Sequence, residues 1–101
     1  MIISSGVKAV IEGSAFISLV TKNPDGAPHP IIAGKGEVKD DKVIFGIYKM
    51  EVTQKNLAVD NSAWLVAATM ADGPKGYRIS GTAQPADKQL IFTPEKVEEL
   101  I

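Results

Sequence analysis

Short apolar runs separated by turn residues make up most of the chain, a pattern typical of β-strands. Residues 15–21 (AFISLVT) are rich in β-branched and aromatic types and are followed by Asn23, Pro24, Asp25 and Gly26. Proline suits the first central position of a turn, and Asp-Gly supplies a local hydrogen-bonding group and a residue free to adopt positive φ. The pattern therefore predicts a strand, a tight turn and a chain that returns along the first strand.

Two further extended segments are predicted in the first half of the chain. Residues 30–38 contain Gly34 and Gly36, which indicate a bulge or a place where another group comes close to the backbone. Residues 43–48 (VIFGIY) would carry apolar side chains on both faces of a strand. Both faces of this third strand must therefore be covered.

The hydrophobic period changes after the third strand. Residues 51–61 (EVTQKNLAVDN) place apolar positions among good helix formers and predict one short helix. Residues 64–71 predict a fourth strand, and residues 77–84 alternate cleanly and predict a fifth with one wet face. Residues 89–93 predict a sixth strand, which forms a hairpin with the fifth across residues 85–88.

The last segment carries a helix-start signal. Thr93 suits the cap, Pro94 suits the first helical position, and acidic Glu95 follows, so a final turn of helix is predicted. The fold class is therefore mainly β: a six-stranded antiparallel barrel, closed or partly closed, with one short helix between strands 3 and 4 and a short C-terminal helix. Residues 1–101 show no repeat or linker and predict a single domain.

Composition supports a globular fold and excludes several partner classes. Apolar residues make up 45% of the chain and charged residues 23%. The 11 basic and 12 acidic residues leave a net charge of -1, so we expect no nucleic-acid partner and no membrane partner. No apolar stretch approaches the roughly 20 residues of a membrane-spanning helix, and residues 1–7 lack the features of a signal peptide. The absence of cysteine is compatible with the reducing cytoplasm, which is the expected location.

The chain offers little for nucleophilic or metal chemistry. Without cysteine, thiolate catalysis and cysteine-bound zinc are excluded. The single histidine, His29, lies between two prolines, and a half-exposed residue at a strand start is favoured over a hydroxyl nucleophile system built around it. A lone histidine lacks the paired spacing of a metal site, and the one metal role left open for it is ligation of haem. No catalytic residue and no metal site are assigned.

The start of the predicted helix has the features of an anion site. The first N–H groups of a helix are free to donate and carry partial positive charge. Thr53 adds a hydroxyl, and Lys49 and Lys55 add full charges. Thr53 and Asn56 are three residues apart, so both could point at one ligand. Ordinary short helices also carry such residues on their wet side, and spacing alone leaves both interpretations open.

Four segments in order carry a resemblance to a known family: residues 16–21 with the turn DGAPHP at 25–30, IFGI at 44–47, TQKNL at 53–57 and YRISGTA at 77–83. Together they resemble the FMN-binding split-barrel family, which includes pyridoxamine 5'-phosphate oxidase and small FMN-binding proteins. The match spans roughly residues 10–93, and the order of the motifs carries it, because no single motif is specific.

The resemblance implies a split β-barrel that forms a homodimer and binds FMN in the groove between subunits. It implies that the FMN phosphate lies near the helix start, with Thr53 and Asn56 as ligands and Lys49 as charge partner. The isoalloxazine ring would lie along strands 2 and 3 and meet backbone amides, where glycines allow a close approach. The predicted cofactor-binding residues are Ile32, Ala33, Gly34, Lys35, Gly46, Ile47, Tyr48, Lys49, Thr53 and Asn56.

The chain departs from the family pattern at three places. Many relatives carry lysine or arginine immediately before the helix threonine, where this chain has Val52. Residues 31–34 (IIAG) lack a polar or aromatic residue beside the ring, and residues 85–88 stand where relatives insert a helix that shapes the substrate pocket. Pyridoxamine phosphate oxidation is therefore not transferred. The expected function is an FMN-binding flavoprotein, an oxidoreductase or electron carrier of unknown substrate. The alternative is a non-catalytic barrel, or a haem or deazaflavin binder, that uses the same groove.

Overall fold

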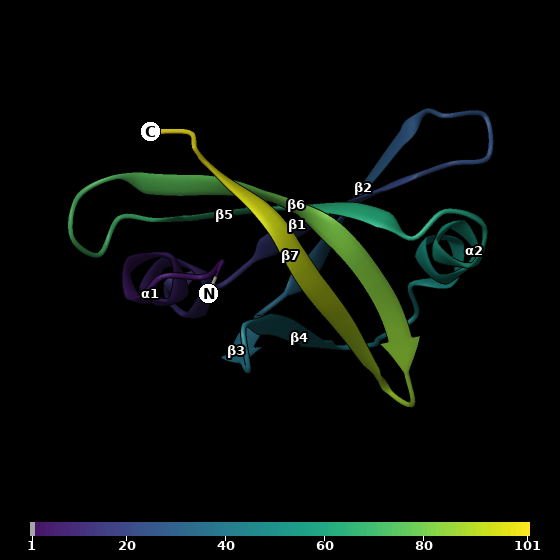
Figure 1. The fold of residues 1–101 in the computed structure, drawn as a ribbon, viewed down its shortest axis with the longest axis horizontal. Helices are drawn as coiled ribbons and strands as arrows, with labels where there is room; N and C mark the ends of the chain where they lie inside the picture. Colours follow the sequence, from purple (N-terminus) through teal and green to yellow (C-terminus); the bar gives the residue numbers. More distant parts are fainter. Residues whose placement is uncertain (1) are drawn as a thin grey trace.

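The computed structural model describes residues 2–101, which form one antiparallel sheet and two helices (Figure 1). The sheet has seven strands in the order β2-β1-β5-β6-β7-β4-β3. Figure 1 shows that the long strands β6 and β7 curve strongly and that the helices lie at opposite ends of the sheet. The elements are α1 (Ser5–Gly13), β1 (Ile17–Lys22), β2 (Pro28–Gly34), β3 (Glu37–Lys39), β4 (Lys42–Gly46), α2 (Glu51–Val59), β5 (Ser62–Thr69), β6 (Lys75–Ala86) and β7 (Gln89–Glu99).

Alternate residues of each strand point into one hydrophobic core. In β1, Ile17, Leu19 and Thr21 are buried, whereas the residues between them are partly exposed. The same alternation runs along β5 and β6, as expected for strands with one covered face. Phe45 of β4 and Phe92 of β7 are completely buried and are among the largest side chains of this core. The core therefore fixes which face of each strand remains available to a partner or ligand.

The predicted fold class is correct in its main features, but the predicted count of six strands is wrong. The segment predicted as one strand over residues 30–38 forms both β2 and β3. Gly34 has φ 88° and lies opposite Ile17 at a β-bulge. A Cβ on Gly36 would lie 2.8 Å from Val43 Cγ1, so core side chains pack directly on this bare backbone. The two glycines mark a bulge and a close approach, and the group that approaches Gly36 is the protein's own core.

The predicted C-terminal helix is also wrong, because its residues extend strand β7 to Glu99. Pro94 lies opposite Gly81 at a shift in register between β7 and β6, where a residue without an N–H is tolerated. A Cβ on Gly81 would collide with the carbonyl oxygen of Thr93, so glycine lets the two backbones meet. The local helix-start signal is therefore overruled by long-range strand pairing.

Helix α1 is absent from the sequence-based prediction, although the chain carries its signal. Val7, Val10 and Ile11 are spaced for one buried helical face, and all three are buried against the sheet. Ser4 caps the helix, because its Oγ accepts a hydrogen bond from Val7 N at 3.3 Å. Residues 2–101 thus form two helices, of which the sequence predicts only the one between β4 and β5.

Strands β1, β2 and β5 expose apolar side chains on the side opposite the core. Val20 lies opposite Trp64, and Ser18 lies between Ile32 and Val66, so these residues share one face of the sheet. Ile32 is 64% exposed, and Phe16, which precedes β1, is 75% exposed. The apolar residues of this surface, called the outer apolar face below, are Phe16, Val20, Ile32, Trp64 and Val66.

Candidate functional site

Helix α2 begins at a strained turn without a capping side chain. Its N-cap residue, Met50, has φ 52°, and Lys49 before it has φ 65°. This left-handed conformation costs a non-glycine residue about 1 kcal/mol or more. Gln54 Nε2 donates to Lys49 O at 3.1 Å and helps to hold the turn. The first N–H groups of α2 are therefore left without a side-chain acceptor, and they carry the positive end of the helix dipole.

Thr53, in the first turn of α2, holds a buried hydroxyl that makes no hydrogen bond. Its side chain is 1% exposed, and within residues 2–101 its Oγ1 is the buried side-chain polar atom that lacks a partner. Leaving such a group unpaired costs about 1–3 kcal/mol. A hydroxyl beside uncapped N–H groups is a donor set that suits a phosphate. Thr53 thus remains a candidate phosphate ligand.

Asn56 is buried but is already paired within the protein. Its Nδ2 donates to Thr21 Oγ1 at 3.1 Å and to Asn23 Oδ1 at 3.0 Å. These bonds use both N–H groups of the amide and tie α2 to β1 and the turn after it. Asn56 therefore orients the helix that carries Thr53, whereas the two side chains are not directed at one shared point.

The start of α2 forms one wall of a cleft of about 440 Å³, called the α2 cleft below. Lys49 and Thr53 both line it, which brings together two residues of the predicted phosphate site. His29 of β2 also lines it, a contribution that the sequence-based assignment misses. The predicted turn at residues 23–26 is the sequence signal for the position of His29, because a tight hairpin brings β2 back along β1 and toward α2. The lining residues are His29, Ile31, Lys49, Met50, Glu51, Val52 and Thr53.

The residues predicted to meet the isoalloxazine ring lie outside the α2 cleft. Lys35 and Gly46 line a second cleft of about 420 Å³. The Lys35 ammonium is bound there to the Glu12 carbonyl at 2.8 Å, at the end of α1. Ile47 N donates to Lys88 O at 2.9 Å, so this amide is occupied by the β6–β7 turn.

The four remaining predicted ring residues are all at least partly accessible. Ile32 and Tyr48 are largely exposed, Tyr48 at 80%. Ala33 is half-buried and packs against the core. Gly34 occupies the bulge described above. Within one chain the predicted ring residues are therefore spread over the second cleft, the β6–β7 turn and the open surface.

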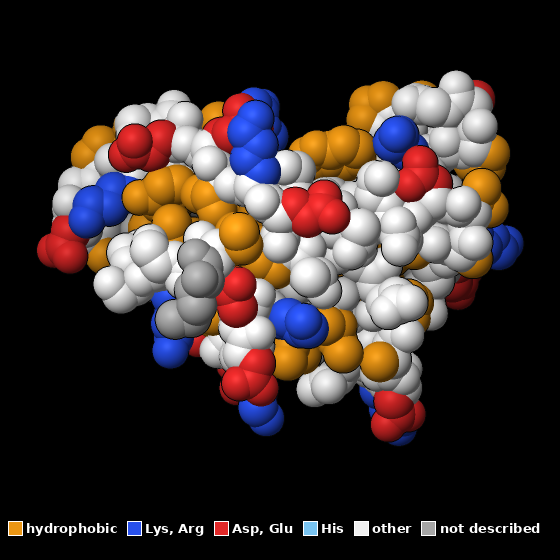
Figure 2. Space-filling model, in the orientation of Figure 1, with side chains coloured by type: hydrophobic (Ala, Val, Ile, Leu, Met, Phe, Trp, Pro, Cys, Tyr) orange, Lys and Arg blue, Asp and Glu red, His pale blue; other side chains and the backbone are white. Residues whose placement is uncertain are grey.

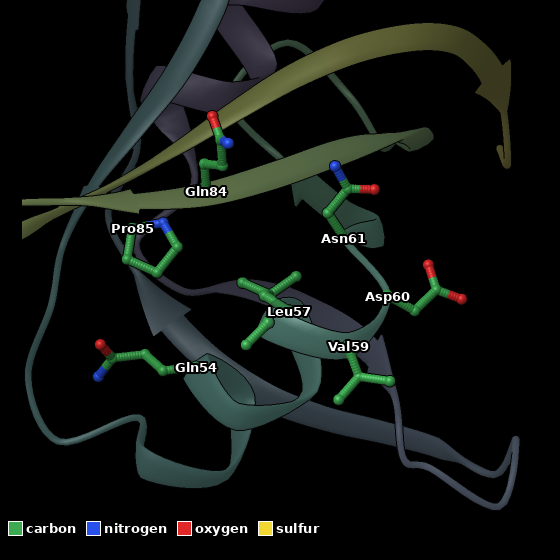
Figure 3. Close-up of a pocket in the computed structure, with 8 residues that line it drawn as sticks. Gln54, Leu57, Val59, Asp60, Asn61, Gln84 and Pro85 are labelled. Atoms are coloured by element: carbon green, nitrogen blue, oxygen red, sulfur yellow. The ribbon is translucent and has the colours of Figure 1, made fainter.

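A larger cleft of about 860 Å³ lies beside the C-terminal half of α2 (Figure 3). Leu57 lies between the helix and Pro85 of β6, and Gln54, Asn61 and Gln84 also line this cleft. Asp60 lies on the rim of this cleft. Its pKa is lowered because Ser62 donates hydrogen bonds to its carboxylate, the backbone N–H at 2.9 Å, and because the Lys22 ammonium lies 3.4 Å away. No predicted cofactor residue lines this cleft.

Ionisable side chains are scattered over the described surface. Figure 2 shows acidic and basic side chains mixed on the face in view, without a large area of one sign. Within residues 2–101 no three His, Cys, Asp or Glu side chains come together as metal ligands. In the same part of the chain, neither helix has the length and apolar character needed to cross a membrane.

Comparison with solved structures identifies the fold. The chain superposes on HupZ of Group A Streptococcus with a TM-score of 0.80 at 16% identity, covering 96% of this chain and 93% of that one. An FMN-binding protein of Syntrophomonas wolfei gives a TM-score of 0.76 at 13% identity, covering 93% and 83%. A heme binding protein of Mycobacterium smegmatis gives 0.76 at 12% identity, and 92% of this chain covers 51% of that one.

These likenesses confirm the split-barrel fold that the sequence motifs predict. No family model matches the sequence, and no curated protein matches it either. At identities of 12–16% the shared property is the fold alone.

Proposed function

We propose, from the split-barrel fold and the α2 cleft, that this chain is an FMN-binding flavoprotein that acts as an oxidoreductase or an electron carrier. The observation that carries the proposal is the buried, unpaired Oγ1 of Thr53 beside the uncapped start of α2. FMN supplies redox chemistry through its isoalloxazine ring when it is bound. The protein contributes binding, orientation and exclusion of water.

The phosphate would be held by three kinds of donor in the α2 cleft. Thr53 Oγ1 and the first N–H groups of α2 would donate hydrogen bonds, and Lys49 would supply a positive charge. Asn56 would act indirectly, by holding α2 against Thr21. Val52 places an apolar side chain where many members of the family carry a cation, so the charge on Lys49 matters more here.

Access to Thr53 requires the turn before α2 to move. Its hydroxyl is covered, and Lys49 and Met50 already hold left-handed backbone. A ligand that pulls this turn into a more favourable conformation would recover part of the strain. The exposed ring of Tyr48, which lies 5.7 Å from the Lys49 ammonium, belongs to the same segment. We therefore expect FMN binding to reorder residues 47–50.

A homodimer would bring the predicted ring residues into one site. The outer apolar face is unpartnered in the single chain, and exposed apolar surfaces of this kind usually mark interfaces. Ile32 belongs both to this face and to the predicted ring contacts. The second copy would therefore cover the outer apolar face and close the groove in which the ring lies. The cytoplasm remains the proposed location, with which the absence of cysteine is compatible.

The main alternative is a non-catalytic barrel that uses the same groove for another ligand or for a protein partner. Glu51 favours it, because a carboxylate lining the α2 cleft opposes a phosphate and Val52 supplies no compensating cation. Haem is one candidate ligand, because a heme binding protein is among the similar structures, and a deazaflavin would suit the same groove. Each ligand class has its own visible spectrum.

Titration of FMN into the purified protein tests the proposal. We expect an absorbance band near 450 nm, roughly that of bound oxidised flavin, and saturable binding. Thr53→Val should weaken FMN binding by about tenfold or more, because it removes one charge-assisted hydrogen bond. The same variant should unfold no more easily than the wild type, because an unpaired buried hydroxyl is replaced by an apolar group of the same shape. Equal FMN affinities, or a colourless protein that ignores FMN, would contradict the proposal.

A further inference from the structure

We propose that His29 is a second cationic ligand of the phosphate in the α2 cleft, so that protonation of its imidazole strengthens the binding of a phosphate monoester. This inference rests on the proposed function, which assigns the cleft to the FMN phosphate. The sequence alone assigns His29 no such role. The structure supplies two observations for it, its position beside α2 and the charge balance of the cleft.

The register of the first hairpin directs His29 toward α2. His29 lies opposite Thr21 in the β1–β2 ladder, and residues directly opposite each other share a face of the sheet. Thr21 is fully buried and accepts the hydrogen bond from Asn56 of α2, so this face is the one on which α2 packs. His29 is half-buried there and lines the same cleft as Thr53.

The net charge of the side chains that line the cleft depends on whether His29 is protonated. Lys49 and Glu51 line the cleft with opposite charges, so their formal charges cancel when the imidazole is neutral. A phosphate monoester carries about -1.5 to -2 charges at pH 7, and the helix start offers only about half a positive charge. A protonated His29 would therefore give the cleft the net positive charge that its ligand requires.

Charges on the neighbouring elements do not substitute for His29. On β1, Lys22 lies on the opposite face of the strand, with its ammonium 5.8 Å from the Trp64 ring and 3.4 Å from Asp60. In the turn between β1 and β2, Asp25 accepts a hydrogen bond from Ala27 N at 3.0 Å. Affinity for the phosphate should therefore depend on the charge of the His29 imidazole.

Binding of FMN and of riboflavin, which lacks the phosphate, separates this role from a structural one. Dissociation constants would be measured for the wild type and His29→Gln at about pH 5.5 and about pH 8. The ratio of the variant's constant to that of the wild type removes the titration of the phosphate itself. For FMN this ratio should rise by about fivefold to tenfold on acidification, whereas for riboflavin it should stay constant.

Two further variants sharpen the test. His29→Lys keeps a positive charge over this pH range, so its FMN affinity should equal or exceed that of the wild type at the higher pH. Glu51→Gln removes the opposing carboxylate and should raise FMN affinity at both pH values while leaving the pH dependence in place. A pH-independent FMN ratio for His29→Gln would overturn the role of His29 alone. Failure of every variant and of the wild type to bind FMN would overturn the proposed function and this role together.

Discussion

Asn56 Nδ2 and Thr21 Oγ1 form a buried hydrogen bond of 3.1 Å that joins α2 to the first strand across 35 residues of chain. The same amide donates to Asn23 Oδ1 in the turn that leads to β2. One side chain thus fixes the helix that carries Thr53 and the hairpin that carries His29. A single amide group therefore links the two walls of the α2 cleft.

Asn56→Ala should destabilise the fold through the loss of both bonds. Buried hydrogen bonds contribute about 1 kcal/mol each, and an unsatisfied partner adds to the loss, so the free energy of unfolding should fall by about 2–3 kcal/mol. Urea denaturation followed by tryptophan fluorescence would measure it. Lys55→Ala, an exposed neighbour on the same helix, serves as control and should change the free energy by less than about 0.5 kcal/mol. Equal effects of the two substitutions on the free energy of unfolding would refute the stabilising role of the Asn56 hydrogen bonds.

Gly81→Ala should be costly for a different reason, the close approach of two backbones. Its added Cβ would collide with Thr93 O at the shift in register between β6 and β7. Overpacking of this kind costs about 1–3 kcal/mol, and the backbone contact favours the upper end. Gly46→Ala is the matched control, because a Cβ there meets nothing within 4 Å. Thermal unfolding of both variants would compare them, and a Gly81→Ala protein as stable as wild type would exclude this packing.

Local sequence signals predict this fold best where partners are close along the chain. The turn at residues 23–26 forms as predicted, with Gly26 N donating to Asn23 O at 2.8 Å. The alternation along β6 also survives, because every second residue from Tyr77 faces the core. The helix-start signal at Thr93 fails, because the pairing of β7 with β6 outweighs a cap worth about 1 kcal/mol.

The candidate site shows the same division between local and long-range information. Thr53 and Lys49 are predicted from the start of one helix, and the structure brings them to one cleft. The commitment of the Asn56 amide to Thr21 depends on how α2 docks on β1, which no spacing within the helix reveals. The left-handed turn at Lys49 and Met50 likewise contains no glycine, so the sequence does not predict its backbone conformation. Docking and backbone strain are properties of the whole sheet rather than of a motif.

Acidification should weaken the attachment of the N-terminal segment through Asp41. Its carboxylate accepts hydrogen bonds from Ile2 N at 2.9 Å and Ile3 N at 2.8 Å, and these bonds hold the pKa of Asp41 below its ordinary value of 3.8. A pKa lowered on folding contributes stability that is present above the unfolded value and is lost as pH falls through the folded value. Wild type should therefore lose this contribution below pH 3.8.

Asp41→Asn tests the sign of this linkage. The variant should show a smaller drop in the free energy of unfolding than wild type when the pH falls from about 5 to about 2.5, because its side chain has no charge to lose. Chemical denaturation at the two pH values provides the comparison. Asp72→Asn, at an exposed aspartate between β5 and β6, should retain the drop of the wild type. An identical acid response in Asp41→Asn and Asp72→Asn would rule out a stabilising contribution from the hydrogen bonds between Asp41 and the N-terminal segment.

Assembly is the property on which the proposed flavin groove most depends, and Val66 tests it. Val66 lies in the middle of the outer apolar face, opposite Ser18, which in turn lies opposite Ile32. Val66→Lys would place a charge at the centre of a dimer contact, while the core side of β5 stays unchanged. Sedimentation should show a dimer for wild type and a folded monomer for Val66→Lys, with FMN affinity reduced by about tenfold or more. Lys88→Glu, in the exposed β6–β7 turn, should remain dimeric. A monomeric wild type that still binds FMN tightly would show that one chain completes the site without its copy.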